Sequence, residues 1–137
     1  MSIPQNKAEI NCDSAKILHD KGNYPSVAHC SYYACYQLIK HIWLYKLGKS
    51  EVELDALCKE KKREGSHEVL INQIGSYIKN SSNKNKIDDF RVFNNNLVAL
   101  KKLRVKADYK DVNFDSIDSS NAISLSDSVI PLLKKYQ

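Results

Sequence analysis

The sequence predicts an all-α protein, an antiparallel up-and-down bundle of four main helices plus short helices. Apolar residues recur with helical spacing in five segments, and the alternation typical of strands is absent. Only 4 glycines and 3 prolines occur among 137 residues, and 42% of the residues are hydrophobic, which is typical of a globular chain. Short connections between the segments favour antiparallel neighbours. We therefore expect a single domain, 1–137, without an internal repeat.

The first two helices are predicted at 7–21 and 24–47, each followed by a glycine. The second helix has two apolar faces. One face carries Val27, Cys30, Ser31, Ala34, Leu38, Ile42 and Tyr45, and the other carries Tyr32, Tyr36, Ile39, Trp43 and Leu47. Only a narrow stripe of His29, Tyr33, Gln37 and Lys40 is polar. A helix with two apolar faces needs neighbours on both, so it is either the central helix of the bundle or is shared with a partner subunit.

The middle of the chain predicts a short charged helix and then a longer one. The segment 50–65 reads SEVELDALCKEKKREG, which indicates a short helix followed by a basic loop. Ser66 is a suitable N-cap for a helix at 67–79. The polar linker NSSNKNK separates that helix from the next.

Two further helices complete the predicted bundle. One spans 88–106, and Asp118 or Ser119 is expected to cap the last, which ends near Tyr136. Pro131 lies within this last helix and should kink it or break it late.

The overall composition excludes several classes of protein. The formal net charge of +5 could attract an acidic partner or nucleic acid, but it is equally consistent with an ordinary solvated surface. The four cysteines include no C-x-x-C pair, so we expect no metal site and no cofactor. No run approaches the roughly 18 apolar residues needed to cross a membrane. The N-terminus lacks a signal-peptide pattern, and free thiols suit the reducing cytoplasm.

Arg104 occupies a place where the helical pattern calls for an apolar residue. Phe90, Phe93, Leu97 and Leu100 share one face of the helix at 88–106, and Arg104 continues that face. Its guanidinium either reaches solvent over the helix end or lies in a cleft, where it needs an acceptor. Asp108, four residues later, could supply that acceptor. From periodicity alone, a structural ion pair between Arg104 and Asp108 is favoured over a functional role for Arg104 in a cleft.

His67 also leans onto an apolar face, at the start of its predicted helix. A lone histidine in such a position more often packs in the core than acts as a catalyst. His19, His29 and His41 show no unusual placement.

Three segments occur together in order: GNYPSVAHCSYYACYQLI at 22–39, GSHEVL at 65–70 and LRVKADY at 103–109. This pattern resembles the small HEPN-domain proteins of bacteria and archaea, over about 8–136. The resemblance implies a helical bundle that commonly forms homodimers. It also implies a role in toxin–antitoxin or phage-defence modules, often beside a minimal nucleotidyltransferase. Active members are metal-independent endoribonucleases whose motif is an arginine, four to six residues, then a histidine.

The sequence departs from that ribonuclease motif. Arg104 matches the arginine, but the residue after the four-residue spacer is Tyr109, and no histidine follows His67. Metal-free RNA cleavage needs groups that accept and donate protons near neutral pH, as histidine does. Tyrosine, with a pKa near 10, does not suit that task.

Three functions remain open. The first is a non-catalytic module that binds a partner nucleotidyltransferase, a nucleotide or RNA through a groove around Arg104. In it, Asp108 pairs with the arginine, and Tyr32, Tyr33 and Tyr109 could stack on a base. The second is a metal-independent endoribonuclease toxin, with His67 meeting Arg104 in space. The third is a plain dimerising scaffold that uses the second apolar face of the helix at 24–47.

Overall fold

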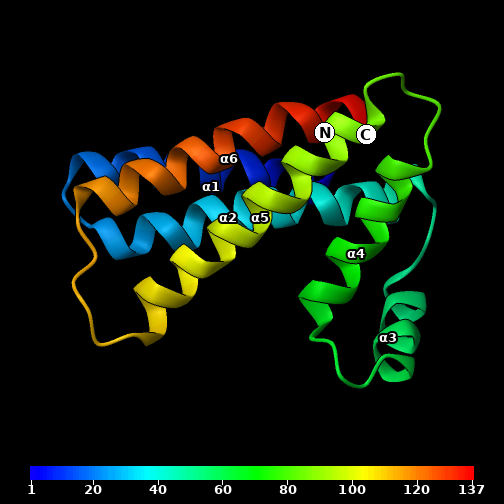
Figure 1. The fold of residues 1–137 in the computed structure, drawn as a ribbon, viewed down its shortest axis with the longest axis horizontal. Helices are drawn as coiled ribbons and strands as arrows, with labels where there is room; N and C mark the ends of the chain where they lie inside the picture. The colour runs from blue at the N-terminus through cyan, green and yellow to red at the C-terminus, as the bar shows by residue number, and fades with distance from the viewer.

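The computed structural model describes residues 1–137, and all of its regular structure is helical. In chain order the elements are α1 (Ile3–Asp20), α2 (Tyr24–His41), the π-helix η1 (Ile42–Lys46), α3 (Glu51–Glu60), α4 (Ser66–Lys79), α5 (Lys86–Tyr109) and α6 (Ser116–Tyr136). The long helices α1, α2, α5 and α6 form the bundle, while the shorter α3 and α4 extend from one end of it (Figure 1). The predicted all-α bundle of four main helices is confirmed.

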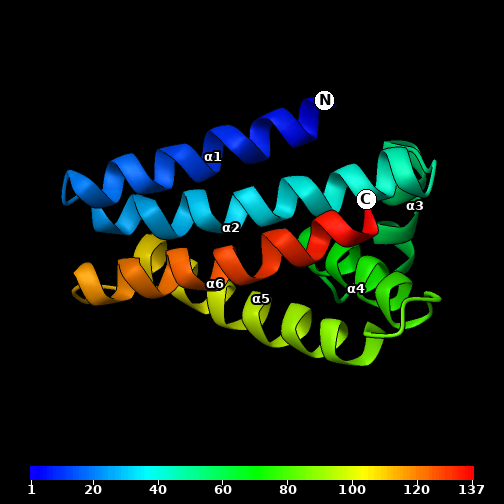
Figure 2. The ribbon, with the colours of Figure 1, turned by 90° about the horizontal axis from the view of Figure 1, so that it is seen from above.

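Helix α2 is the centre of the bundle. It packs against α1, α4, α5 and α6, and Figure 2 shows α1 and α5 on opposite sides of the layer that α2 and α6 form. Val27 and Ala34 on one face and Tyr32 and Ile39 on the other are completely buried. Both apolar faces are therefore covered within one chain, as the first of the two predicted alternatives requires.

The end of α2 differs from the prediction. The α-helix stops at His41 and continues as one wide π turn over Ile42–Lys46, closed by the Leu47 N–H donating to the Ile42 carbonyl at 2.8 Å. A wider turn shifts side chains out of the 100° register. This is why Tyr45, predicted on an apolar face, is 58% exposed.

Three helix starts also differ from the prediction. Helix α1 begins at Ile3, not at 7, because Ser2 and Gln5 form a reciprocal capping box. Helix α4 includes Ser66, which is not its cap; Gly65 precedes it without a side-chain bond. Helix α5 starts earlier and ends later than expected, at 86–109.

The last helix differs from the prediction at its N-cap, and it is not broken at Pro131. Its N-cap is Asp115, whose carboxylate accepts from the Ile117 and Asp118 N–H groups, so neither Asp118 nor Ser119 is the cap. The helix also runs on through Pro131 to Tyr136. Pro131 itself is exposed, while Leu132 and Leu133 are buried in the core and hold this turn in place.

Two contacts position α5 against its neighbours. A Cβ atom added to Gly75 would lie 3.2 Å from a ring carbon of Phe90, so a glycine here lets α4 lie close to α5. At the other contact, the buried Asp89 accepts from the Tyr136 hydroxyl at 2.7 Å and from the Lys135 ammonium at 2.9 Å. None of the helices has the length and apolar character to cross a membrane.

Candidate functional site

The Arg104 side chain lies between α5 and α2, with 13% of it exposed. Its guanidinium carbon lies 4.8 Å from the ring centre of Tyr32 and 5.9 Å from that of Tyr33. One terminal nitrogen is 3.5 Å from the carboxylate of Asp108, whereas the buried Nε has no hydrogen-bond partner. The guanidinium is therefore held in place by aromatic rings while its capacity to donate hydrogen bonds is only partly used.

The His67 ring lies at the start of α4 and faces the same aromatic residues. It stacks on Tyr36 with ring centres 4.0 Å apart, and its Nδ1 is 3.1 Å from the Tyr32 hydroxyl oxygen. Tyr32 is completely buried and contacts both His67 and Arg104. His67 and Arg104 therefore lie on either side of Tyr32, and each contacts it.

The surroundings set the charge state of these groups. Burial lowers the pKa of His67, and the positive charges of Arg104, Lys101 and Lys40 lower it further. Burial also raises the pKa of Tyr32 and of Tyr36 to about 12 in each case. Near neutral pH the site therefore contains a neutral imidazole, two protonated phenols and one fixed cation.

His29 joins this cluster, although its position in the sequence gave no reason to expect it. Its Nδ1 lies 3.6 Å from the Asp108 carboxylate, and its ring centre is 4.7 Å from that of Tyr33. The side chain is 52% exposed. The narrow polar stripe of α2 was the available signal, because it placed His29 and Tyr33 one turn apart on the same face.

Tyr109 lies outside the cluster. It is 72% exposed at the end of α5, and it makes no ring contact with the other aromatic residues of the site. One step along a helix turns a side chain by about 100°, so Tyr109 points away from Asp108, and its part in stacking on a base stays a prediction.

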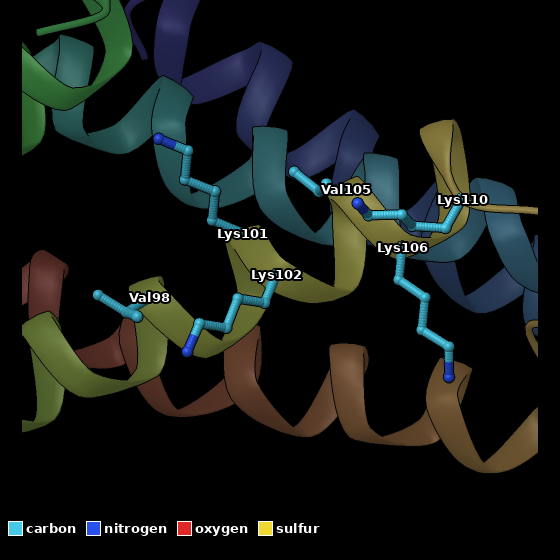
Figure 3. A pocket seen from close by; sticks show the side chains of 6 residues that line it. All are labelled: Val98, Lys101, Lys102, Val105, Lys106 and Lys110. Carbon is cyan, nitrogen blue, oxygen red and sulfur yellow. The ribbon is translucent and has the colours of Figure 1, made fainter.

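An open hollow lies on the neighbouring face of α5 rather than over Arg104. It is lined by Val98, Lys101, Lys102, Val105, Lys106 and Lys110, and no acidic side chain lines it (Figure 3). Lys101 belongs both to this face and to the charges that act on His67. We call these six residues the lysine face; it adjoins the aromatic site.

A family model described as the HEPN domain matches residues 5–136. The chain belongs to the HEPN-domain family. No curated protein and no solved structure gives a significant match. In this HEPN protein, the three segments that carried the resemblance meet at one place: the tyrosines of α2, His67 of α4, and Arg104 with Asp108 of α5. No group of histidine, cysteine and acidic residues is arranged to hold a metal ion.

The electrostatic contact between Arg104 and His67 leads to a testable prediction. Arg104→Gln should raise the pKa of His67, but not to the value of a free imidazole, because burial is the larger cause of its lowering. The measurement is an NMR titration of the His67 ring. Arg91→Gln, on the exposed side of α5, should leave the titration unchanged. An unaltered pKa in Arg104→Gln would contradict the described proximity.

The lowered pKa of His67 also determines how the stability of the protein depends on pH. A histidine with a lowered pKa in the folded state binds its proton more weakly than in the unfolded chain. The neutral ring therefore contributes stability that is fully present above pH about 6.5 and is lost as the pH falls through the folded-state pKa. Arg104→Gln should make this loss smaller.

Proposed function

We propose that this HEPN protein is a non-catalytic module that binds the phosphate groups of RNA or a nucleotide at Arg104 and His67. The observation that carries the proposal is the guanidinium of Arg104, which Tyr32 and Asp108 hold in place without a short hydrogen bond to its terminal nitrogens. In keeping with the family resemblance, we place the module in a cytoplasmic toxin–antitoxin or phage-defence system. There we expect it to form a homodimer and to act with a nucleotidyltransferase-type partner.

The contact between Arg104 and Asp108 supports a phosphate ligand. At 3.5 Å it is longer than the roughly 2.7–2.9 Å of strong charge-assisted hydrogen bonds. A phosphate could receive two short, parallel bonds from the same guanidinium, which arginine is well suited to donate. The rings of Tyr32 and Tyr33 already restrict the arginine, so less conformational entropy is lost on binding.

The lysine face favours RNA, a polyanion, as the ligand rather than a small nucleotide. Of its four lysines, only Lys106 is engaged in an ion pair, with Asp118 at 2.9 Å. Lys101 acts on His67 as Arg104 does, so it connects the lysine face with the aromatic site, and Figure 3 shows the four lysines spread along α5. Several lysines on one face attract the phosphate backbone of RNA, because binding releases the counterions of the phosphates. This attraction depends little on the base sequence.

The proposal is tested by measuring binding of a fluorescent single-stranded RNA to the purified protein. Arg104→Ala should raise the dissociation constant by about 10- to 100-fold, since a charged hydrogen bond contributes roughly 1.5–3 kcal/mol. Arg91→Ala removes an arginine of the same helix whose side chain is 66% exposed, and it should change binding by less than about twofold. Equal affinities in the wild type and Arg104→Ala would show that the site is not used.

A second candidate is a metal-independent endoribonuclease. The observation that favours it is a neutral His67 beside a fixed arginine, because a neutral imidazole is the form that accepts a proton. Arg104 could stabilise the charge that develops on the phosphate during cleavage. This candidate requires a second group that donates a proton to the leaving oxygen.

A further inference from the structure

We propose that the lysine face of α5 binds RNA as a single strand and that Tyr109 stacks on one of its unpaired bases. The inference rests on the proposed RNA-binding function and deepens it. It names the form of RNA that is bound and a second contact surface outside the Arg104 site.

Tyr109 lies on the same side of α5 as the lysine face. It is the last residue of the helix, four residues after Val105 and seven after Lys102, and residues with these spacings share one face of an α-helix. Lys110, which lines the hollow, follows Tyr109 directly in the chain. The tyrosine therefore extends the lysine face toward the end of α5.

The Tyr109 ring has no structural partner. The chain has two exposed aromatic residues, Tyr45 and Tyr109. Tyr45 stacks on His41 with ring centres 5.3 Å apart, whereas Tyr109 contacts no other ring. Packing in the core therefore does not account for an aromatic residue at this position. An exposed ring beside several lysines is the combination with which proteins bind single-stranded nucleic acids.

The hollow of the lysine face has an apolar strip with charges on either side of it. Val98 is 48% exposed, and Val105 is partly exposed. Helical spacing places these two valines between Lys101 on one side and Lys102 on the other. Figure 3 shows the two lysine side chains extending in different directions, so their ammonium groups do not converge on one point.

This distribution of charge fits a strand better than a single phosphate group. A site for one phosphate brings its hydrogen-bond donors together around the anion. Separated lysines beside an apolar strip instead suit a chain whose successive phosphates reach the ammonium groups while a ribose or a base covers the valines. Lys101 lines the hollow and also acts on His67, so one strand could contact both the lysine face and the Arg104 site.

An unpaired strand fits the surface better than a duplex. In A-form RNA the bases are stacked inside the helix, and the major groove is too deep and narrow for side chains to read. A duplex would therefore offer the Tyr109 ring only ribose and phosphate groups. A single strand can turn a base outward to stack on the ring, and such stacking does not depend on which base it is.

The test measures the binding of three fluorescent RNAs of equal length to the purified protein. They are a single strand, a duplex, and a single strand whose bases are replaced by abasic sites. Tyr109→Ala should raise the dissociation constant of the ordinary single strand by about 10-fold, the loss expected for one stacked base. It should change the binding of the duplex and of the abasic strand by less than about twofold. Tyr109→Phe keeps the ring and should bind the single strand within about twofold of the wild type.

Two further variants separate the ring from the charges. Tyr45→Ala removes the other exposed tyrosine, in η1, and should leave all three dissociation constants within about twofold of the wild type. Lys102→Gln should weaken the binding of all three RNAs. It should also reduce the salt dependence of single-strand binding by about 0.7 in the slope of log K against log salt, the change expected for one lost phosphate contact. Since Tyr109 and Lys102 are exposed, the melting temperatures of their variants should match that of the wild type.

Several results would overturn the proposal. Unchanged binding of the single strand by Tyr109→Ala would exclude stacking, and so would equal losses on the ordinary and the abasic strands. If the lysine face instead binds an acidic helix of a partner protein, Lys102→Gln will leave RNA binding unaltered, and the proposal is wrong.

The two proposals can fail separately. Normal binding by Tyr109→Ala together with weaker binding by Arg104→Ala would exclude stacking on Tyr109 and still support the phosphate site. The reverse result would exclude the phosphate site and support a single strand on the lysine face. A wild-type protein that binds no RNA would contradict both.

Discussion

Asp89→Ala should lower the free energy of unfolding by about 2–3 kcal/mol. The Asp89 side chain is 11% exposed and receives hydrogen bonds from Tyr136 at 2.7 Å and Lys135 at 2.9 Å. Most of the loss should come from Tyr136, because this change leaves its buried hydroxyl without an acceptor. The contribution of Lys135, which is 44% exposed, should be small. Urea denaturation followed by circular dichroism measures the difference.

The neighbouring residue provides a matched control. Asp88 precedes Asp89, but its side chain is 79% exposed and pairs only with Arg91. Asp88→Ala should change the free energy of unfolding by less than about 0.5 kcal/mol. Asp89→Asn, which keeps an oxygen that can accept from Tyr136, should cost about half as much as Asp89→Ala. Similar values for Asp88→Ala and Asp89→Ala would contradict the described contact between α5 and α6.

Tyr32→Ala should have the largest effect on stability, a loss of about 4 kcal/mol. The Tyr32 ring is completely buried at the centre of α2, and its removal leaves a cavity between α2, α4 and α5. The change should also weaken RNA binding, because Arg104 loses the ring on which it packs. Urea denaturation and the RNA-binding assay provide the two measurements.

Tyr32→Phe separates the two roles of this residue. It keeps the ring under Arg104 and removes only the hydroxyl that contacts His67, so it should cost about 1 kcal/mol. RNA binding should stay within about threefold of the wild type. If Tyr32→Phe lost as much binding as Tyr32→Ala, the hydroxyl and not the ring would be the important contact.

Much of the fold could be predicted because helical periodicity reflects burial. The two apolar faces of α2 indicated a helix with neighbours on both sides, either central or shared with a partner subunit, and the ends marked by Gly22 and Gly48 lie at turns with positive φ. Helix starts were harder to predict. Asp115, Ser2 and Gly65 set them through local hydrogen bonds and backbone angles, which several neighbouring polar residues could have provided equally well. The π turn at Ile42–Lys46 leaves no clear pattern in the sequence.

The candidate site could be predicted only in part. Arg104 and His67 were recognised because each interrupts an apolar face, and Asp108 because it lies one turn from Arg104. His29 interrupts nothing: it lies in a polar stripe and joins the site through Asp108 of a distant helix. Tyr109 follows Asp108 in the sequence but lies apart from the cluster, because adjacent residues on a helix point in different directions. Contacts between separate helices depend on how those helices pack, which periodicity does not specify.

The residues of the candidate site come from three helices, α2, α4 and α5. No single segment of the chain therefore contains all of the side chains that form it. An unfolded or partly folded chain therefore lacks the assembled site at which the proposed ligand would bind. By thermodynamic linkage, any molecule that occupies the site must also favour the native state, by about 2.7 kcal/mol when its concentration is 100 times its dissociation constant. In a cell, the supply of ligand would in this way influence how long each copy of the protein survives.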